Sequence, residues 1–440
     1  RKLYLIENCI YGVDIQPIAV QIAKMRFFIS LVVDQKVDPA QPNLGVRPLP
    51  NLETKFVAAN TLIGIEKPAQ QLLRNPAIDA KEAELRQVRE RHFTARTPAT
   101  KARCRELDAK LRAEISELLR ADGFARETTE KLAHWNPYDQ NASADFFDPE
   151  WMFGIRDGFD IVIGNPPYVR IQTLTAAEPA AVAYYKQRYV SASKGNYDLY
   201  VVFVERSLQL LQPRGHLAYI LPHKFFNAQY GQPLRELLAG GRHLRHVVHF
   251  GDQQIFPGAT NYVCLLFLAK AGADACRWVR ADDLPAWLAT QRAPETALPA
   301  ARLTAAEWNF AVGPASGLFE KLQRMPVKLG QLAERISQGI RTSANEIYVL
   351  DVVSERGGFI TARSKQLDKE VVLERRAVSR FLAGREIKAY SIQPSGKVVI
   401  IPYELRSGKS VLIPTGELED HCPKTAAYLR ANKKYLEARE

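Results

Sequence analysis

Apolar residues recur along this chain at two different spacings, and these spacings predict alternating strands and helices. Residues 159–164 form an apolar run with β-branched residues at its centre, which is typical of a short strand buried on both faces. Two prolines shortly after it prevent the strand from continuing. Residues 3–15 predict a helix end and then a strand that ends at Asp14. Residues 18–33 have apolar positions at helical spacing, and residues 55–62 predict a further strand with its exit loop.

The same pattern continues beyond the first half of the chain. We predict a helix at 201–211 that ends before Gly215, followed by a strand at 216–221. A strand–helix–strand succession of this kind requires parallel pairing. Residues 244–250 and 262–268 predict the last two strands, and the short connection between them implies an antiparallel pair. Together these elements predict an α/β sheet domain.

Composition divides the chain into further regions. Residues 65–133 are rich in Glu, Lys, Arg and Ala and predict a helical hairpin inserted into the sheet domain. Its arginines suit DNA phosphates, but a charge run is more often a solvated helix face. An Ala- and Pro-rich stretch at 276–325 predicts a connector, and residues 326–440 a further domain. The sheet domain then comprises residues 1–64 and 134–275.

Charge and cysteine content narrow the class of protein. The net charge of +12 favours a polyanionic partner, and nucleic acid is the first candidate. No pair among the five cysteines has metal-ligand spacing, so we predict no metal and a reduced, cytoplasmic setting. The apolar runs are too short to span a membrane. The chain does not begin with Met and opens directly into a predicted element, so we expect a segment of a longer polypeptide.

The predicted strand that precedes Asn165 delivers a polar amide to its carboxyl end, where ligands of open α/β sheets bind. Asn165-Pro166-Pro167-Tyr168 in this place resembles the catalytic motif of amino-group methyltransferases that use S-adenosylmethionine. The aromatic stretch at 135–153 and the order of motifs resemble more specifically the adenine-N6 DNA methyltransferases of type IIG restriction–modification and BREX-type phage-defence systems. This resemblance implies a Rossmann-like class I methyltransferase sheet, S-adenosylmethionine as cofactor and double-stranded DNA as partner.

The motif residues suit this chemistry. The exocyclic nitrogen of adenine is a poor nucleophile, because its lone pair is delocalised into the ring. The side-chain oxygen of Asn165 and the backbone carbonyl of Pro166 are two acceptors for its hydrogens, which favours a tetrahedral nitrogen mainly in the transition state. Tyr168 offers a face on which a flipped base stacks. The resemblance assigns the other face of the base to Phe256, whereas a loop Phe packed into the core is the structural alternative.

The resemblance also implies how the cofactor is held. A carboxylate at the tip of a strand accepts hydrogen bonds from both ribose hydroxyls, a role that falls to Asp14, while Ile15 lies against the adenine ring. Asn60 stands where the family contacts the adenine amino group of the cofactor, and Asn165 borders the same site. The alternatives are a helix-capping role for Asp14 and a loop role for Asn60, in which its side chain bonds its own backbone.

The C-terminal region resembles the target-recognition domain of the same family. The similar segments are residues 329–343, 380–387 and 422–429. Arg341 and Arg385 are predicted DNA contacts, because arginine suits both phosphate and guanine. The resemblance implies that this domain is incomplete here, and that a nuclease domain, where the family has one, lies upstream.

One departure from the family keeps other functions open. No Gly-rich loop precedes Asp14, so we expect the first strand of the sheet to lie upstream of residue 1. One alternative is a non-catalytic DNA-recognition subunit on a methyltransferase scaffold. Another is a methyltransferase that acts on RNA or on protein glutamine, because such enzymes share the Asn-Pro-Pro-Tyr motif.

Overall fold

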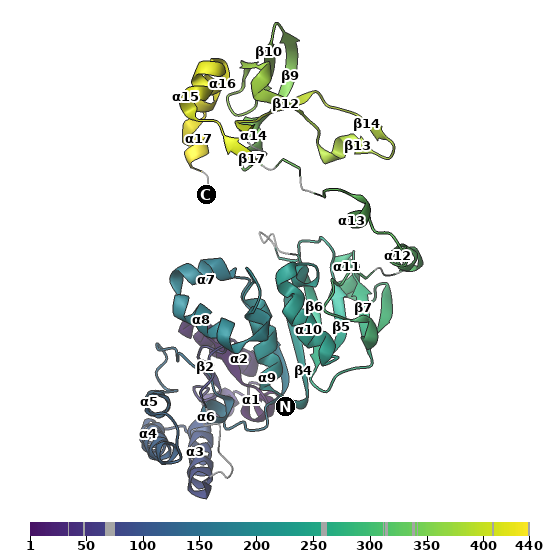
Figure 1. Ribbon diagram of the computed structural model, residues 1–440. Helices are drawn as coiled ribbons and strands as arrows, with labels where there is room; N and C mark the ends of the chain where they lie inside the picture. Colours follow the sequence, from purple (N-terminus) through teal and green to yellow (C-terminus); the bar gives the residue numbers. More distant parts are fainter. Residues whose placement is uncertain are drawn as a thin grey trace. The chain divides into compact units, whose positions relative to one another are not determined.

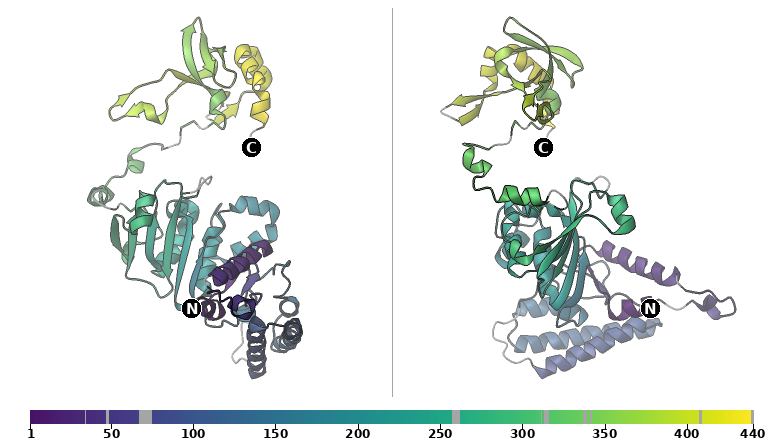
Figure 2. Two further views of the ribbon diagram at one scale, coloured as in Figure 1. Left: turned by 180° about the vertical axis from the view of Figure 1, so that it is seen from behind. Right: turned by 90° about the vertical axis from the view of Figure 1, so that its right-hand side faces the viewer.

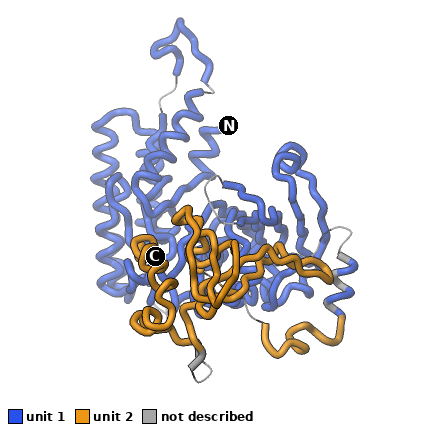
Figure 3. The backbone as a smooth tube through the Cα atoms, turned by 90° about the horizontal axis from the view of Figure 1, so that it is seen from above, with its two compact units in different colours: residues 1–324 blue, residues 325–440 orange. Residues whose placement is uncertain are grey.

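The computed structural model describes residues 1–33, 35–46, 49–66, 75–256, 262–310, 312, 316–336, 339–340, 342–406 and 409–438. The chain divides into two compact units, residues 1–324 and 325–440 (Figure 3). Each unit has its own sheet and its own apolar core. Within the described ranges, no helix combines the length and the apolar character that crossing a membrane requires.

Unit 1 is built on a six-stranded mixed sheet with the strand order β3-β4-β6-β5-β7-β8 (Figure 1). Its strands are β3 (Phe159–Gly164), β4 (Leu211–Pro222), β5 (Leu244–His249), β6 (Val263–Ala269), β7 (Ala275–Arg280) and β8 (Glu295–Pro299). β3 runs parallel to β4, which confirms the predicted strand–helix–strand unit. β5 and β6 are antiparallel, as their short connection predicts.

Helices cover one face of this sheet more completely than the other. The covering helices are α7 (Ile171–Ala177), α8 (Pro179–Arg188), α9 (Tyr200–Leu210) and α10 (Gln232–Gly240). Their apolar residues, Val204 and Leu234 among them, are fully buried against strand residues such as Leu217 and Leu266. On the opposite face, α11 (Leu284–Thr290) packs through Trp287 against a smaller cluster.

A second, two-stranded sheet carries the first predicted strands. β1 (Gly12–Asp14) and β2 (Phe56–Ala58) pair in parallel. They are flanked by α1 (Lys2–Asn8) and α2 (Pro17–Val33). α2 begins at a proline, whose missing N–H is not needed in the first turn of a helix. The predicted helix at 18–33 is therefore confirmed.

The charged segment between β2 and β3 is helical. α3 (Pro76–Thr94) and α4 (Pro98–Ala121) pack side by side, and the hydroxyl of Thr97 caps the start of α4. Two shorter helices follow, α5 (Arg126–His134) and α6 (Pro149–Phe153), so the predicted hairpin is extended by a third helix within its range. The fully buried carboxylate of Asp108 binds Arg89 and Arg112 at 2.9 and 2.7 Å, and so ties α3 to α4.

Unit 2 contains a five-stranded antiparallel sheet with the order β11-β10-β9-β15-β12. Its strands are β9 (Val349–Arg356), β10 (Phe359–Ser364), β11 (Lys369–Glu374), β12 (Val378–Phe381) and β15 (Lys397–Ile400). Two hairpins lie outside this sheet: β13 (Ile387–Lys388) with β14 (Ser391–Ile392), and β16 (Tyr403–Arg406) with β17 (Lys409–Leu412). The helices of the unit are α13 (Leu329–Leu332), α14 (Asn345–Tyr348), α15 (Thr415–His421), α16 (Pro423–Ala431) and α17 (Lys433–Glu437). Tyr428 of α16 packs into the core of the unit.

The prediction that residues 159–164 are buried on both faces is wrong. β3 lies at the edge of its sheet, and Ile161 and Ile163 are 64% and 75% exposed. β1 and β2 form a separate sheet, so within the described residues β3 has a strand partner only on its β4 side. An apolar run indicates that a segment suits burial, but the neighbours that would cover it are set by the tertiary structure.

Two further predictions need correction. Gly215 does not follow the end of a helix: it lies inside β4, which begins at Leu211 directly after α9. A Cβ at Gly215 would come within 2.7 Å of the Phe159 carbonyl oxygen, so close packing explains this glycine. The stretch at 276–325 is not a plain connector either, because β7 and β8 add two strands to the sheet. Its Ala and Pro content concealed the alternating buried residues of β7.

Candidate active site

A cavity of about 760 Å³ opens where β1, β2 and β3 end, and we call it the carboxyl-end cavity. Its lining includes one acidic side chain and the amide side chains that the sequence singles out. The strands that carry or precede these residues belong to two different sheets. The predicted site residues that line it are Asp14, Ile15, Asn60, Asn165, Pro166 and Pro167. The structure thus brings together the residues predicted for cofactor binding and most of the catalytic motif.

Asp14 is the last residue of β1 and is exposed. One carboxylate oxygen, Oδ1, accepts a hydrogen bond of 2.8 Å from the backbone N–H of Gln16, in the turn that leads to α2. A carboxylate has two oxygens and about four acceptor positions, so holding this turn is compatible with binding a ligand. Ile15 follows directly, and its side chain is 55% exposed along the cavity lining.

Asn60 follows β2 and holds its own loop. Its side-chain oxygen accepts from the backbone N–H of Leu62 at 3.1 Å, which is the loop role that the sequence left open. The loop is also held from outside: Arg206 of α9 donates to the carbonyl of Thr61 at 2.9 Å, and the Tyr189 hydroxyl donates to the carbonyl of Leu62 at 2.5 Å. Asn60 is therefore presented to the cavity on a fixed loop.

The Asn165–Tyr168 turn is anchored at both ends. Before it, β3 pairs with β4 up to Gly164. After it, the segment at 169–171 forms a short antiparallel bridge with residues 197–199, through backbone hydrogen bonds of 2.8 and 2.9 Å. Pro166 is buried, whereas Asn165 is exposed at the cavity. The turn is thus fixed in position while its amide side chain faces the cavity.

Tyr168 does not line the carboxyl-end cavity, but packs beside it on a second apolar cluster. Its hydroxyl donates to the carbonyl of Ile220 at 3.1 Å, and burial raises the pKa of Tyr168 to about 12. Phe256 packs against the same cluster, which contains Val248, Phe250, Val263, Val279 and Ala281. The two residues predicted to stack on a base therefore share one part of unit 1.

The ring of Tyr168 packs against a chain of hydrogen-bonded, largely buried side chains. The ring of Tyr168 meets that of Tyr200 edge-on at a centroid distance of 6.5 Å. The fully buried hydroxyl of Tyr200 bonds that of Tyr230 at 2.8 Å, and Tyr230 donates to the carboxylate of Asp198 at 3.0 Å. Burial is the main cause that raises the pKa of both tyrosines, so the hydroxyls stay protonated as donors. From the sequence alone, Asp198 and Tyr200 could equally face the target-base pocket or open the following helix, and there is no signal for Tyr230.

Other residues that line the carboxyl-end cavity were not predicted. Phe203 of α9 and Glu178, which lies between α7 and α8, are among them. Phe203 stands in an apolar run in which several neighbours are buried, so helical periodicity does not show which side chain reaches the cavity. Asp14 and Glu178 are the two charged residues among the described lining residues, and both are acids.

The two predicted DNA-contact residues belong to the C-terminal part of the chain. Arg385 is exposed in a short 3₁₀ turn of unit 2 (Gly384–Glu386). Arg341 lies outside the described residues. The carboxyl-end cavity is lined by residues of unit 1.

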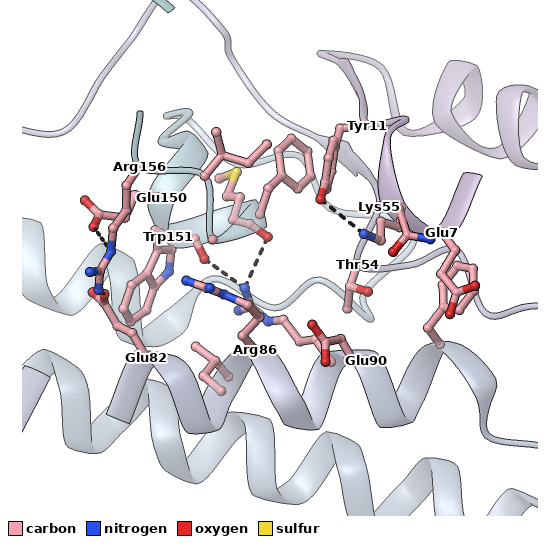
Figure 4. Close-up of a pocket in the computed structure, with 18 residues that line it drawn as sticks. Glu7, Tyr11, Thr54, Lys55, Glu82, Arg86, Glu90, Glu150, Trp151 and Arg156 are labelled. Atoms are coloured by element: carbon pink, nitrogen blue, oxygen red, sulfur yellow. Dashed lines mark hydrogen bonds and ion pairs between the residues drawn. The ribbon is translucent and has the colours of Figure 1, made fainter. Parts of the chain in front are cut away.

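A second cavity, of about 460 Å³, lies where β1 and β2 begin, and we call it the amino-end cavity (Figure 4). Charged side chains from α1, α3 and α6 line it, and none of the predicted site residues does. Arg156 bonds Glu82 and Glu150 at 2.7 and 3.0 Å. The two cavities share Tyr11 and Phe153, whose ring centroids are 4.8 Å apart.

Comparison with known proteins gives a family match for this chain. A family model described as "Eco57I restriction-modification methylase" matches residues 8–256, which include every predicted site residue of unit 1. The type II restriction enzyme and methyltransferase RM.Eco57I of Escherichia coli is 28% identical over 286 residues, which are 63% of this chain and 28% of that protein. The type II methyltransferase M.PaeR7I of Pseudomonas aeruginosa is 26% identical over 342 residues, which are 74% of this chain and 53% of that protein.

This chain therefore spans between about a quarter and about half of the length of these two relatives. Among solved structures, the type IIL restriction-modification enzyme MmeI in complex with DNA aligns with the whole chain and half of its own, at 12% identity and a TM-score of 0.42.

Proposed function

Because this chain belongs to the Eco57I restriction-modification methylase family, we propose that it methylates the N6 amino group of adenine in duplex DNA, with S-adenosylmethionine as methyl donor. The observation that carries the proposal is the convergence of Asp14, Asn60 and Asn165 on one cavity at the ends of three strands. Cytoplasmic DNA is the substrate that this proposal implies. A linked nuclease activity is a further part of it, motivated by the fused enzyme RM.Eco57I.

The lining of the carboxyl-end cavity fits this cofactor. Asp14 offers carboxylate oxygen for the ribose hydroxyls, and Ile15, Phe203 and Pro167 offer apolar surface for a purine ring. The charged lining residues, Asp14 and Glu178, are acids, which suits the positive charge of a sulfonium. When bound, the cofactor supplies an electrophilic methyl group on that sulfonium.

The residues of the chain then act on the amino group of the target base. The side-chain oxygen of Asn165 and the carbonyl oxygen of Pro166 accept its two hydrogens, which draws the nitrogen towards tetrahedral geometry and localises its lone pair. These hydrogen bonds strengthen as positive charge develops on the nitrogen, so their effect is greatest in the transition state. The anchored turn holds both acceptors in place before the base arrives.

Base flipping brings the target adenine out of the DNA helix and next to the Asn165–Tyr168 turn. Tyr168 lies next to Asn165 in sequence and packs on the same apolar cluster as Phe256, which supports a pair of aromatic surfaces for a base outside the helix. The buried Asp198–Tyr230–Tyr200 chain supports the Tyr168 ring at its edge.

The proposal is tested with the natural polypeptide that contains this chain. It is incubated with methyl-labelled S-adenosylmethionine and mixed-sequence duplex DNA, and the DNA is digested to nucleosides. We expect label in N6-methyladenine. We also expect Asn165→Ala to reduce the rate by about 10²- to 10³-fold, the scale of losing one transition-state hydrogen bond. Asn141→Ala, a change at an exposed loop asparagine outside the cavity lining, is the matched control.

Two outcomes contradict the proposal. DNA binding without transfer of label would favour a non-catalytic recognition subunit on this scaffold. Label that enters RNA or protein glutamine instead of DNA would show that DNA is not the substrate.

A further inference from the structure

The carboxyl ends of β4 and β5 lie at the edge of the sheet where β3 also ends. β6 lies between β4 and β5 and runs antiparallel to both, so its start lies at the same edge (Figure 2). Three ring side chains gather there: His223 directly after β4, His249 at the end of β5, and Tyr262 directly before β6. The ring centroid of His223 lies 4.1 Å from that of His249 and 6.5 Å from that of Tyr262.

His223 binds residues on both sides of the connection between β5 and β6. Its ring nitrogen Nε2 lies 3.1 Å from the carbonyl oxygen of Gly251, and because a carbonyl only accepts, Nε2 carries the hydrogen and donates. The backbone N–H of His223 donates to the carbonyl of Tyr262 at 3.2 Å. One residue at the end of β4 therefore holds the start of segment 250–256 and the residue that precedes β6.

His249 binds the same glycine. The backbone N–H of Gly251 donates to Nδ1 of His249 at 2.9 Å, so this nitrogen carries no hydrogen. Burial is the main cause that lowers the pKa of His249 to about 3 and also lowers the pKa of His223, so both rings are neutral at pH 7. Gly251 has a φ of 65°, a conformation that favours glycine. Both backbone polar groups of Gly251 are thus bound by imidazole rings.

The segment is held again two residues later. The side-chain amide of Gln253 donates to the carbonyls of Phe250 and Ala281, at 2.9 and 2.5 Å. Phe256 follows on the same segment and packs on the apolar cluster that Tyr168 also contacts. The hydrogen bonds at the start of the segment therefore restrict where the Phe256 ring can lie.

We propose that His223 is a positioning residue for base flipping, which holds the segment that carries Phe256 at the end of β4. The carbonyl of Ile220 on the same strand holds the hydroxyl of Tyr168, so one strand end sets the spacing of the two rings predicted to stack on the base. The proposal rests on the proposed methylation of adenine in duplex DNA. His223 does not line the carboxyl-end cavity, so it acts through Phe256. Rings fixed before the base arrives need not be ordered on binding.

The test compares two duplexes that carry the sequence methylated by the wild-type natural polypeptide. In one, the target adenine is paired with thymine. In the other it faces cytosine, and extruding a mismatched base takes less energy. We expect His223→Ala to lower the single-turnover rate of methyl transfer by about 10-fold on the paired duplex, the scale of one hydrogen bond, and by less than about 3-fold on the mismatched duplex. A poorly placed ring matters less when the base leaves the helix readily.

Further variants separate positioning from folding. His223→Gln retains a donor near the position of Nε2 and should restore most of the rate on the paired duplex. His223→Phe keeps a ring beside His249 but lacks the donor, so it should show the same loss as His223→Ala even if the alanine variant does not fold. His243→Ala is the matched control, because His243 also binds a backbone carbonyl, that of Ala269 at 3.0 Å, but precedes β5 at the opposite edge of the sheet. It should leave the ratio of the two rates unchanged.

A double variant tests whether His223 acts through Phe256. If both residues act through the same ring, Phe256→Ala combined with His223→Phe should lower the rate no further than Phe256→Ala does alone. Effects of independent residues would multiply instead, and that result would overturn the proposal.

The remaining outcomes distinguish this proposal from the catalytic one. If the His223 variants slow both duplexes equally, or neither, the positioning role is overturned while methylation of adenine stands. A wild-type polypeptide that transfers no methyl group to DNA would contradict the catalytic proposal and this inference with it. Loss on the paired duplex alone, together with rescue by His223→Gln, would support both.

Discussion

The two cavities of unit 1 share a wall but use charge in opposite ways. In the amino-end cavity, part of the charge is paired, because Arg156 binds Glu82 and Glu150 (Figure 4). In the carboxyl-end cavity, two acids stand among apolar and amide side chains. Paired charges hold helices together, whereas acids that face an apolar cavity are available to a cationic ligand. The comparison shows that the number of charged residues around a cavity is a poor guide to its function.

The largest predicted effect is a loss of stability on breaking the ion pairs that hold the wall of the amino-end cavity. Arg89 lines that cavity and is held by the fully buried Asp108, which also binds Arg112. Removing one partner of a buried pair leaves uncompensated charge, so Asp108→Asn should lower the free energy of unfolding by about 3–5 kcal/mol. Urea unfolding measures this change. Glu114→Gln on the same helix, which breaks a partly exposed pair with Lys81, should lower the free energy of unfolding far less, because solvent screens that pair.

Asp108 also predicts a pH dependence. Burial alone would raise the pKa of its carboxyl, but the two arginines outweigh burial and lower it. A carboxyl whose folded pKa is lowered stabilises the protein above its unfolded pKa of about 4, and this contribution is lost as the pH falls through the folded pKa. The stability of the wild type should therefore fall below about pH 4, and Asp108→Asn should reduce that dependence. An unchanged acid profile in the variant would contradict the role of this pair.

An intermediate effect is expected at the carboxyl-end cavity. Asp14→Asn keeps an oxygen for the Gln16 N–H but removes the charge that a ribose and a sulfonium would meet. Affinity for S-adenosylmethionine should fall by about 10- to 100-fold, the scale of a charge-assisted hydrogen bond, with little change in stability. Isothermal titration calorimetry measures the affinity. Asp160→Asn on β3, an exposed acid outside the cavity lining, is the control and should bind normally.

The smallest effect should follow from Arg156→Gln. This side chain meets three acids, Asp79, Glu82 and Glu150, but is itself 38% exposed, so solvent screens the pairs. We expect a loss of about 1 kcal/mol or less, which shrinks at high salt, and no change in cofactor affinity. Thermal unfolding at two salt concentrations tests this. A large loss of cofactor affinity would show that the two cavities are coupled through the wall they share.

Much of the candidate site was predictable because its residues follow strand ends. Asp14 ends β1 and Asn60 follows β2, and the parallel pairing of these strands brings both residues to one edge. Asn165 follows β3 of the other sheet, and the tertiary structure brings it to the same cavity. Phe203 and Tyr230 were not predictable. They come from helical or irregular segments whose apolar residues look alike in sequence, and only packing decides that Phe203 lines the cavity and that Tyr230 bonds Tyr200.

The sequence by itself determined the local elements, namely the strand before Asn165, the helix that starts at Pro17 and the parallel pairing of β3 with β4. These depend on periodicity, β-branching and proline, which act over a few residues. Only the tertiary structure decided that Ile161 and Ile163 are exposed, that residues 275–299 complete the sheet, and that Arg156 pairs with Glu82 at the amino-end cavity. Burial and charge pairing depend on partners distant in the chain, and no local pattern records them.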